Sequence, residues 1–111
     1  MSEDDILQFV RDFLPSAWAL ELLLLLYRER ASAWTCEGLV RELRATLVLV
    51  RQNLAVLVDA GLAAETGDGR YAYHPQTPGL AALVDELAVL HGRKPVTILQ
   101  TIFAPGDRPG R

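Results

Sequence analysis

Residues 34–74, WTCEGLVRELRATLVLVRQNLAVLVDAGLAAETGDGRYAYH, contain the pattern that decides the fold. Thr35 and Thr46 each precede a run of apolar residues at helical spacing, and threonine is a good N-cap for a helix. Gly61 follows the second run, and glycine readily adopts the left-handed conformation that ends a helix. The stretch therefore predicts a short helix over 36–44 and a longer helix that Thr46 opens and Gly61 ends.

The second half of this stretch predicts a β-hairpin. Residues 62–66 and 70–74 are short segments on either side of Gly67-Asp68-Gly69, a sequence typical of a tight turn. The run Leu-Val-Leu-Val at 47–50 could form a strand, but the threonine before it and the glycine after it favour a helix. We therefore expect two helices followed by a hairpin.

Two further helices are expected before this stretch. Ser2 and Asp5 resemble a capping box for a first helix, which ends near Pro15. Ser16 can cap a second helix that runs to about Arg30. This second helix is apolar nearly all round, and such a helix must be covered on most sides. One domain of 111 residues has difficulty in covering it, so the sequence predicts a partner surface.

A helical segment is expected over 77–103. Thr77 with Pro78 marks its start, because proline is favoured at the first position of a helix. Gly92 is expected to interrupt the helix, and Pro95 begins a last apolar stretch. Together with the second helix, this stretch predicts a symmetric homodimer that forms through the first and last helices.

Length and composition indicate a single domain that is mainly α-helical with a small β-hairpin. Half of the 111 residues are apolar, which suffices for one core. We place the domain at residues 1–104, with a helix-turn-helix at about 34–61, a β-wing at about 62–74 and a C-terminal helical segment at about 77–103. Residues 105–111 consist of Gly, Pro and charged residues, and we expect a frayed tail there.

The spacing of these features resembles a known family. A helix cap, three core-facing residues, a helix stop and the start of a hairpin follow one another in register. They are, in this order, Thr46, then Val50, Leu54 and Leu57, then Gly61 and Leu62. This pattern resembles the second helix and wing of winged-helix bacterial transcriptional regulators of the MarR-like and ArsR-like kind. Arg93-Lys94 and the apolar residues 96–103 also resemble the end of small bacterial winged-helix proteins.

The resemblance implies a winged helix-turn-helix with additional N- and C-terminal helices that binds double-stranded DNA. The helix from Thr46 would lie in the major groove, and the wing tip would contact the backbone or minor groove. Arg51 suits guanine and Gln52 suits adenine, although both could equally be solvated positions on an exposed helix. The residues expected to contact DNA are Arg41, Arg44, Thr46, Arg51, Gln52 and Arg70, with Arg28 or Arg30 as further phosphate contacts.

The acidic balance of the chain points to an alternative function. The net charge is −3, and residues 34–75 carry four arginines against five acidic residues. DNA affinity comes largely from neutralising phosphates, so an acidic module binds weakly unless its arginines converge on one face. An apolar outward face also fits a protein–protein interaction module, an adaptor or antagonist, that has lost or weakened DNA binding. The residues expected to contact such a partner are Leu47, Val48, Leu49 and Ala55, unless the helix is rotated so that 47–49 belong to the core.

No catalytic or metal site is predicted. Cys36, His74 and His91 are widely separated and lack the paired spacing of metal ligands. They are interpreted as a buried thiol and two surface or strand-end imidazoles, and Trp18 and Trp34 as core anchors. We therefore expect neither a cofactor nor enzyme activity.

The chain is expected to be cytoplasmic. Acidic residues fill positions 3–5, where a signal peptide would carry basic ones, and a single cysteine cannot form an internal disulfide. The longest apolar stretch, 17–27, contains Glu21 and is shorter than the roughly 18–20 residues that span a bilayer. No membrane contact is expected.

Overall fold

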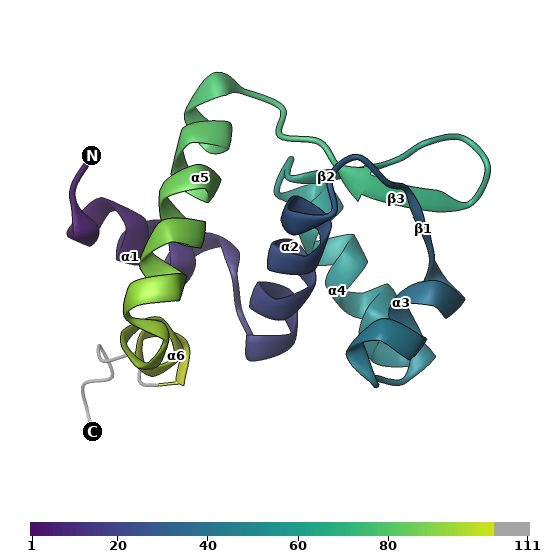
Figure 1. Cartoon of the computed structure of the whole chain (residues 1–111), viewed down its shortest axis with the longest axis horizontal. Coiled ribbons are helices and arrows are strands. Elements are labelled where there is room, and N and C mark those ends of the chain that lie inside the picture. The colour runs from purple at the N-terminus through teal and green to yellow at the C-terminus, as the bar shows by residue number, and fades with distance from the viewer. Residues whose placement is uncertain (104–111) are drawn as a thin grey trace.

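The structure is a computed structural model that describes residues 1–103 as six helices and one three-stranded antiparallel sheet (Figure 1). The helices are α1 (Glu3–Phe13), α2 (Ala17–Arg28), α3 (Cys36–Leu43), α4 (Leu47–Asp59), α5 (Pro78–Arg93) and α6 (Pro95–Phe103). The strands are β1 (Trp34–Thr35), β2 (Ala63–Glu65) and β3 (Arg70–Tyr73), in the sheet order β1-β3-β2. The prediction of a mainly helical chain with a small β-hairpin is confirmed, whereas the tail predicted at 105–111 lies outside the described residues.

Side-chain caps set the starts of the first five helices, as the sequence predicts. At α1, the Ser2 N–H donates to Asp5 Oδ2 (3.0 Å) and the Asp5 N–H donates to Ser2 Oγ (3.2 Å). The hydrogen bond from the Ser2 backbone lowers the pKa of the Asp5 carboxyl. At the start of each helix from α2 to α5, a side-chain hydroxyl accepts a hydrogen bond from the backbone N–H three residues later. These caps are Ser16, Thr35, Thr46 and Thr77.

The packing is centred on α2, which Figure 1 shows between the α1, α5, α6 group and the part formed by α3, α4 and the sheet. Ala19, Leu20 and the five leucines 22–26 are all buried. Because α4 and β3 pack against α2, its apolar surface is covered by its own chain. This finding corrects the inference that α2 needs a partner surface, while the homodimer itself stays a prediction. Within residues 1–103, no helix has both the length and the apolar character needed to cross a membrane.

The α1, α5 and α6 helices form the other packed group. Phe9 and Val10 of α1 are buried, and α6 packs against α1 and buries Ile98. Lys94 Nζ lies 3.1 Å from Glu3 Oε1, so an exposed ion pair joins the start of α1 to the turn between α5 and α6. Val96 and Phe103 of α6 remain exposed.

The α4 helix buries the residues that its spacing predicts. Val50, Leu54 and Leu57 face the core, and the strand alternative for 47–50 is excluded because these residues are helical. Gly61, with φ of 78°, has the left-handed conformation expected after the helix. Asn53 is also buried, which the sequence analysis did not predict.

The sheet contains the predicted hairpin and one additional strand. β2 pairs with β3 in antiparallel register, with Ala64 opposite Ala72. Gly67 and Gly69 in the turn have φ of 105° and 81°, which glycine adopts without strain. β1, which the sequence did not predict, places Trp34 opposite Tyr71 on the other edge of β3.

Three sequence interpretations are wrong in detail. α5 continues through Gly92, and the break lies at Lys94, because a proline disfavours the helical conformation in the residue before it. Trp18 is 37% exposed, so it is a surface residue rather than a core anchor. Cys36 is half-buried rather than fully buried, since α3 turns it toward the space between α4 and the hairpin.

Candidate functional site

The outward face of α4 carries the predicted base-contacting residues. Arg51 and Gln52 are both exposed, because Val50, Leu54 and Leu57 take the opposite face into the core. Thr46 caps this helix, and its hydroxyl accepts the Leu49 N–H at 3.2 Å. Thr46 is thus engaged in positioning the start of α4.

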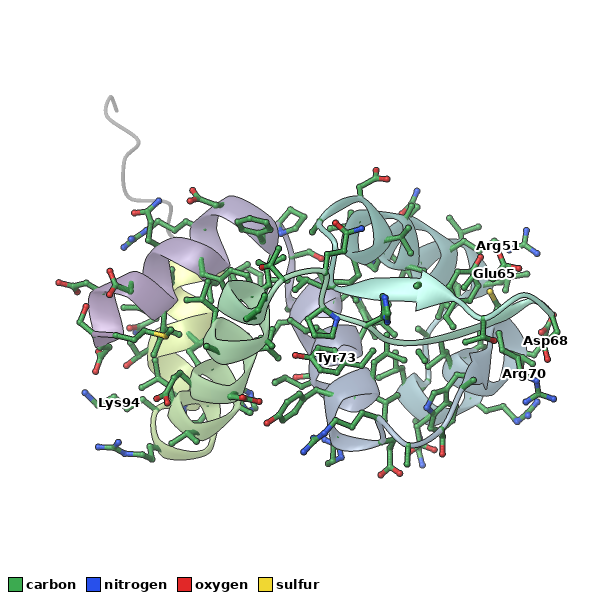
Figure 2. The ribbon with its side chains drawn as sticks, turned by 90° about the horizontal axis from the view of Figure 1, so that it is seen from above. Arg51, Glu65, Asp68, Arg70, Tyr73 and Lys94 are labelled. Atoms are coloured by element: carbon green, nitrogen blue, oxygen red, sulfur yellow. The ribbon has the colours of Figure 1, made fainter. Side chains whose placement is uncertain are left out.

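The remaining predicted DNA contacts come from the C-terminal end of α3 and from the hairpin. Arg41 and Arg44 are exposed, and Arg44 ends α3 in a left-handed conformation with φ of 54°, which is uncommon for a residue other than glycine. Neither arginine forms an ion pair with any described residue. Arg70 lies near the hairpin turn with its Nε 3.6 Å from Asp68 Oδ2, and Figure 2 shows Arg51 and Arg70 at the same end of the molecule.

The four residues predicted to contact a protein partner do not form one exposed face. Val48 is 63% exposed and Ala55 is exposed, but Leu47 and Leu49 are half-buried. Leu49 is turned inward, where it lines a small apolar pocket beside Trp18. The apolar surface that α4 offers is therefore smaller than its sequence suggests.

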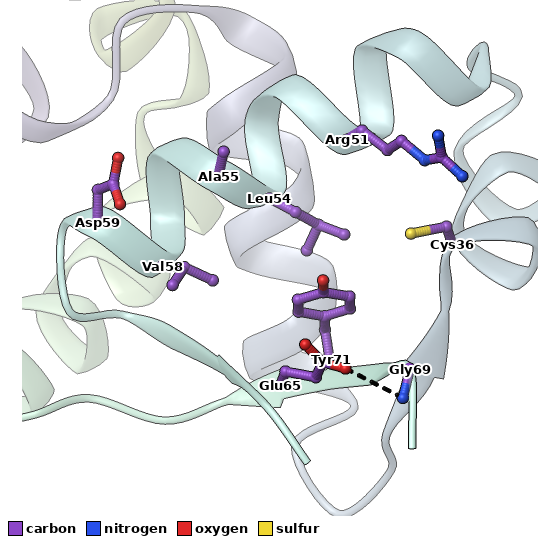
Figure 3. A pocket seen from close by; sticks show the side chains of 9 residues that line it. All are labelled: Cys36, Arg51, Leu54, Ala55, Val58, Asp59, Glu65, Gly69 and Tyr71. Carbon is purple, nitrogen blue, oxygen red and sulfur yellow. Dashed lines mark hydrogen bonds between the residues drawn. The ribbon is translucent and has the colours of Figure 1, made fainter. Parts of the chain in front are cut away.

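A groove with a volume of about 540 Å³ lies between α4 and the hairpin (Figure 3). Residues of α4 at spacings of three, four and eight share one face of the helix and form one side of this groove. The sheet, the hairpin turn and the start of α3 form the other side. The lining residues are Arg51, Leu54, Ala55, Val58 and Asp59 from α4, with Glu65, Gly69, Tyr71 and Cys36 opposite them.

The charges in this groove do not neutralise one another. Arg51 and Asp59 lie toward opposite ends of α4, and Glu65 faces the groove from the hairpin (Figure 3). Glu65 Oε2 accepts a hydrogen bond from the Gly69 N–H at 3.2 Å, which ties this carboxylate to the turn. Among residues 1–103, none of these three charged groups takes part in an ion pair. No sequence motif marks Asp59, Glu65 and Tyr71 as parts of a site, because the groove exists only once the hairpin lies beside α4.

A second polar cluster joins α2, β3 and α5 on the other side of α2. The Tyr27 hydroxyl donates to Asp85 Oδ1 at 2.8 Å, and this hydrogen bond raises the pKa of Tyr27. Tyr73 packs edge-on against the Tyr27 ring with centroids 5.3 Å apart. Its buried hydroxyl has no hydrogen-bond partner among the described residues, and burial raises the pKa of Tyr73 to about 12.

The two remaining candidate phosphate contacts are placed beside this cluster. Arg28 and Arg30 line a separate cavity of about 370 Å³ with His91 of α5, so they do not join the groove beside α4. Arg30 stacks over the Tyr27 ring at 4.4 Å and donates to the Tyr27 carbonyl at 2.8 Å. Within the part of the chain that the structure describes, no three His, Cys, Asp or Glu side chains form a group that could hold a metal ion.

Comparisons with protein-family models, with curated proteins and with solved structures found no match to this chain.

Proposed function

We propose that residues 34–74 form a winged helix-turn-helix that binds double-stranded DNA as a transcriptional regulator. The order β1-α3-α4-β2-β3 supports this proposal, with α4 as the recognition helix and the β2–β3 hairpin as the wing. The spacing of residues between Thr46 and Leu62 resembles that of MarR-like and ArsR-like regulators. This resemblance supports the same assignment.

The observation that carries the proposal is the pair Arg51 and Gln52 on the solvent face of α4. Both are exposed, while the opposite face of the helix is buried against the domain. An arginine side chain forms two hydrogen bonds with guanine, and a glutamine side chain does so with adenine, in the major groove. Arg41 and Arg44, exposed and without ion pairs to described residues, would contact phosphates beside the groove.

The number of available arginines sets the expected salt dependence. Arg41, Arg44 and Arg51 form no ion pair within residues 1–103 and can neutralise phosphates, whereas Arg70 shares its charge with Asp68. Each neutralised phosphate contributes about −0.9 to the slope of log K against log salt concentration, so one domain should give a slope near −3. Binding should therefore be weak at moderate salt and measurable at low salt.

Fluorescence anisotropy with a labelled random-sequence duplex tests the proposal directly. Arg51→Ala should reduce the salt slope by about one, and at the preferred site it should cost about 1–3 kcal/mol and relax selectivity at one base pair. Arg93→Ala is the matched control, because Arg93 is exposed at the end of α5, outside α3, α4 and the hairpin and outside α1 and α6. Absence of binding at low ionic strength, or equal losses in both variants, would contradict the proposal.

We also propose that the domain binds DNA as a homodimer that forms through α1 and α6. The exposed Val96 and Phe103 support this, since apolar side chains on the surface of a helix suit a symmetric contact. Light scattering at micromolar concentration should give twice the monomer mass, and Phe103→Ser should shift the mass toward the monomer. A monomer mass for the unmodified chain would contradict the dimer without affecting the DNA proposal.

A protein partner on α4 is the second candidate function, and the exposure of Val48 favours it. If α4 binds a protein, its apolar contacts carry the binding energy, and Val48→Ala should weaken the binding of that protein more than Arg51→Ala does. If α4 binds DNA, the order is reversed. Val48 is a better probe than Leu47, because Leu47 is half-buried and its truncation would also leave a cavity.

A further inference from the structure

The groove between α4 and the hairpin has the size and lining of a binding site. Its volume of about 540 Å³ falls within the range of about 300–1,000 Å³ that is usual for ligand sites. Leu54, Ala55 and Val58 supply an apolar side, and Tyr71 faces them (Figure 3). An occupant that covers these side chains would gain binding energy from the removal of apolar surface from water.

The charges of the groove define what that occupant must carry. Arg51 and Asp59 are eight residues apart on α4, which corresponds to about 12 Å along the helix axis. Asp59 ends α4, where the helix dipole is negative, so its charge adds to the dipole rather than offsetting it. Neither residue is paired with a described group, and the same is true of Glu65 on the hairpin. An occupant with a single sign of charge would be repelled at one end.

We propose that this groove binds a short segment of a partner protein that carries a carboxylate and a basic side chain on either side of aliphatic residues. The carboxylate pairs with Arg51, and the basic side chain lies near Asp59. At about 3.3 Å per residue, the 12 Å separation corresponds to an acidic and a basic residue about three to four positions apart in an extended segment. The aliphatic residues between them cover Ala55 and Val58.

The segment and DNA would compete for this domain. Arg51 lines the groove and also lies on the proposed DNA-contacting face, so the two ligands need the same guanidinium group. The groove does not depend on DNA binding, and a segment of this kind would bind even if the domain contacts no nucleic acid.

Selection from a random peptide library displayed on phage, with the full chain immobilised, tests the inference. Enriched peptides should share an acidic and a basic residue three to four positions apart with aliphatic residues between them. A synthetic peptide with the enriched sequence should then bind Ala55→Trp at least about tenfold more weakly, because the indole fills the groove. Ala31→Trp makes the same change at an exposed turn position outside the groove, and it should bind like the unmodified chain.

Charge reversal distinguishes specific recognition of the peptide from nonspecific binding. The double variant Arg51→Glu with Asp59→Arg should prefer a peptide in which the acidic and basic residues are exchanged. Circular dichroism checks that each variant keeps its helices. Peptides without a shared charge pattern, or equal affinity for Ala55→Trp and Ala31→Trp, would overturn the inference. Peptide binding with the expected pattern in a chain that binds no DNA would support it and contradict the proposed DNA function.

Discussion

Asn53 joins α4 to the start of α2, and its removal should weaken the domain measurably. The Ser16 hydroxyl donates to Asn53 Oδ1 at 3.1 Å, and Asn53 Nδ2 donates to the Leu49 carbonyl at 2.8 Å. Ser16 also caps α2 by accepting the Ala19 N–H. One buried amide therefore fixes the position of the proposed recognition helix against the central helix of the core.

The size of the effect follows from the partners that Asn53→Ala leaves behind. A typical intramolecular hydrogen bond contributes about 0.5–1.5 kcal/mol net, and this substitution removes two. The Leu49 carbonyl keeps its helical partner, the backbone N–H of residue 53, so it is not left alone. We expect a loss of about 1–3 kcal/mol in the free energy of unfolding, or about 4–13 °C in Tm.

Urea unfolding of Asn53→Ala, Ser16→Ala and the double variant measures the coupling between the two side chains. Ser16→Ala alone should cost about 1 kcal/mol or more, because α2 also loses its cap. The coupling energy should be about 0.5–1.5 kcal/mol, while Gln52→Ala, at an exposed neighbour, should change stability little. Additive losses with a coupling below about 0.3 kcal/mol would refute this account of how α4 is held.

Three further predictions concern the hairpin and its surroundings. Gly61→Ala should lower the free energy of unfolding, measured by urea denaturation, by about 1–2 kcal/mol, because φ is 78° and a Cβ would lie 2.9 Å from Gln76 Oε1. Gly79→Ala in α5 is the control and should change this free energy little. Replacing Gly67 and Gly69 together by valine should disorder the turn, because their positive φ angles do not suit valine, although open space surrounds both. NMR spectra should show this local disorder with the helices still folded. Global unfolding would show that the hairpin is not peripheral. The phenol of Tyr73 should ionise near pH 12 in an ultraviolet titration. Because burial raises this pKa above the usual value of 10.0, the folded state holds the phenol proton more tightly than the unfolded chain, so the free energy of unfolding should fall as pH rises from 10 toward 12. Tyr73→Phe should abolish both the late ionisation and this loss, and it should cost little stability below pH 10, because the Tyr73 hydroxyl has no partner among the described residues.

Local signals account for the parts of the fold that the sequence predicts. Thr46 and Gly61 bound α4 through interactions with residues a few positions away, so both ends of the helix are visible in a short window of sequence. The same holds for the hairpin turn at 67–69. The exposure of Arg51 also follows from helical spacing, since residues 50, 54 and 57 occupy the buried face.

Features that depend on distant parts of the chain could not be predicted. β1 has two residues, and Trp34 pairs with Tyr71, so no periodic pattern marks it. Asn53 is buried because Ser16, 37 positions earlier, supplies a partner for its amide. The groove has the same origin: Arg51 and Glu65 look like ordinary surface charges until the hairpin places them around one space.

The packing of α1 against α6 has a consequence for the synthesis of this protein. Val10 is synthesised well before α6, and it is buried in a group that is complete only when Ile98 has been made, 88 residues later. At a translation rate of about 5–20 residues per second, this interval lasts about 4–18 s. Throughout it, the apolar side of α1 is available to chaperones and to other nascent chains. The rate of translation thus determines how long α1 remains uncovered before α6 is synthesised.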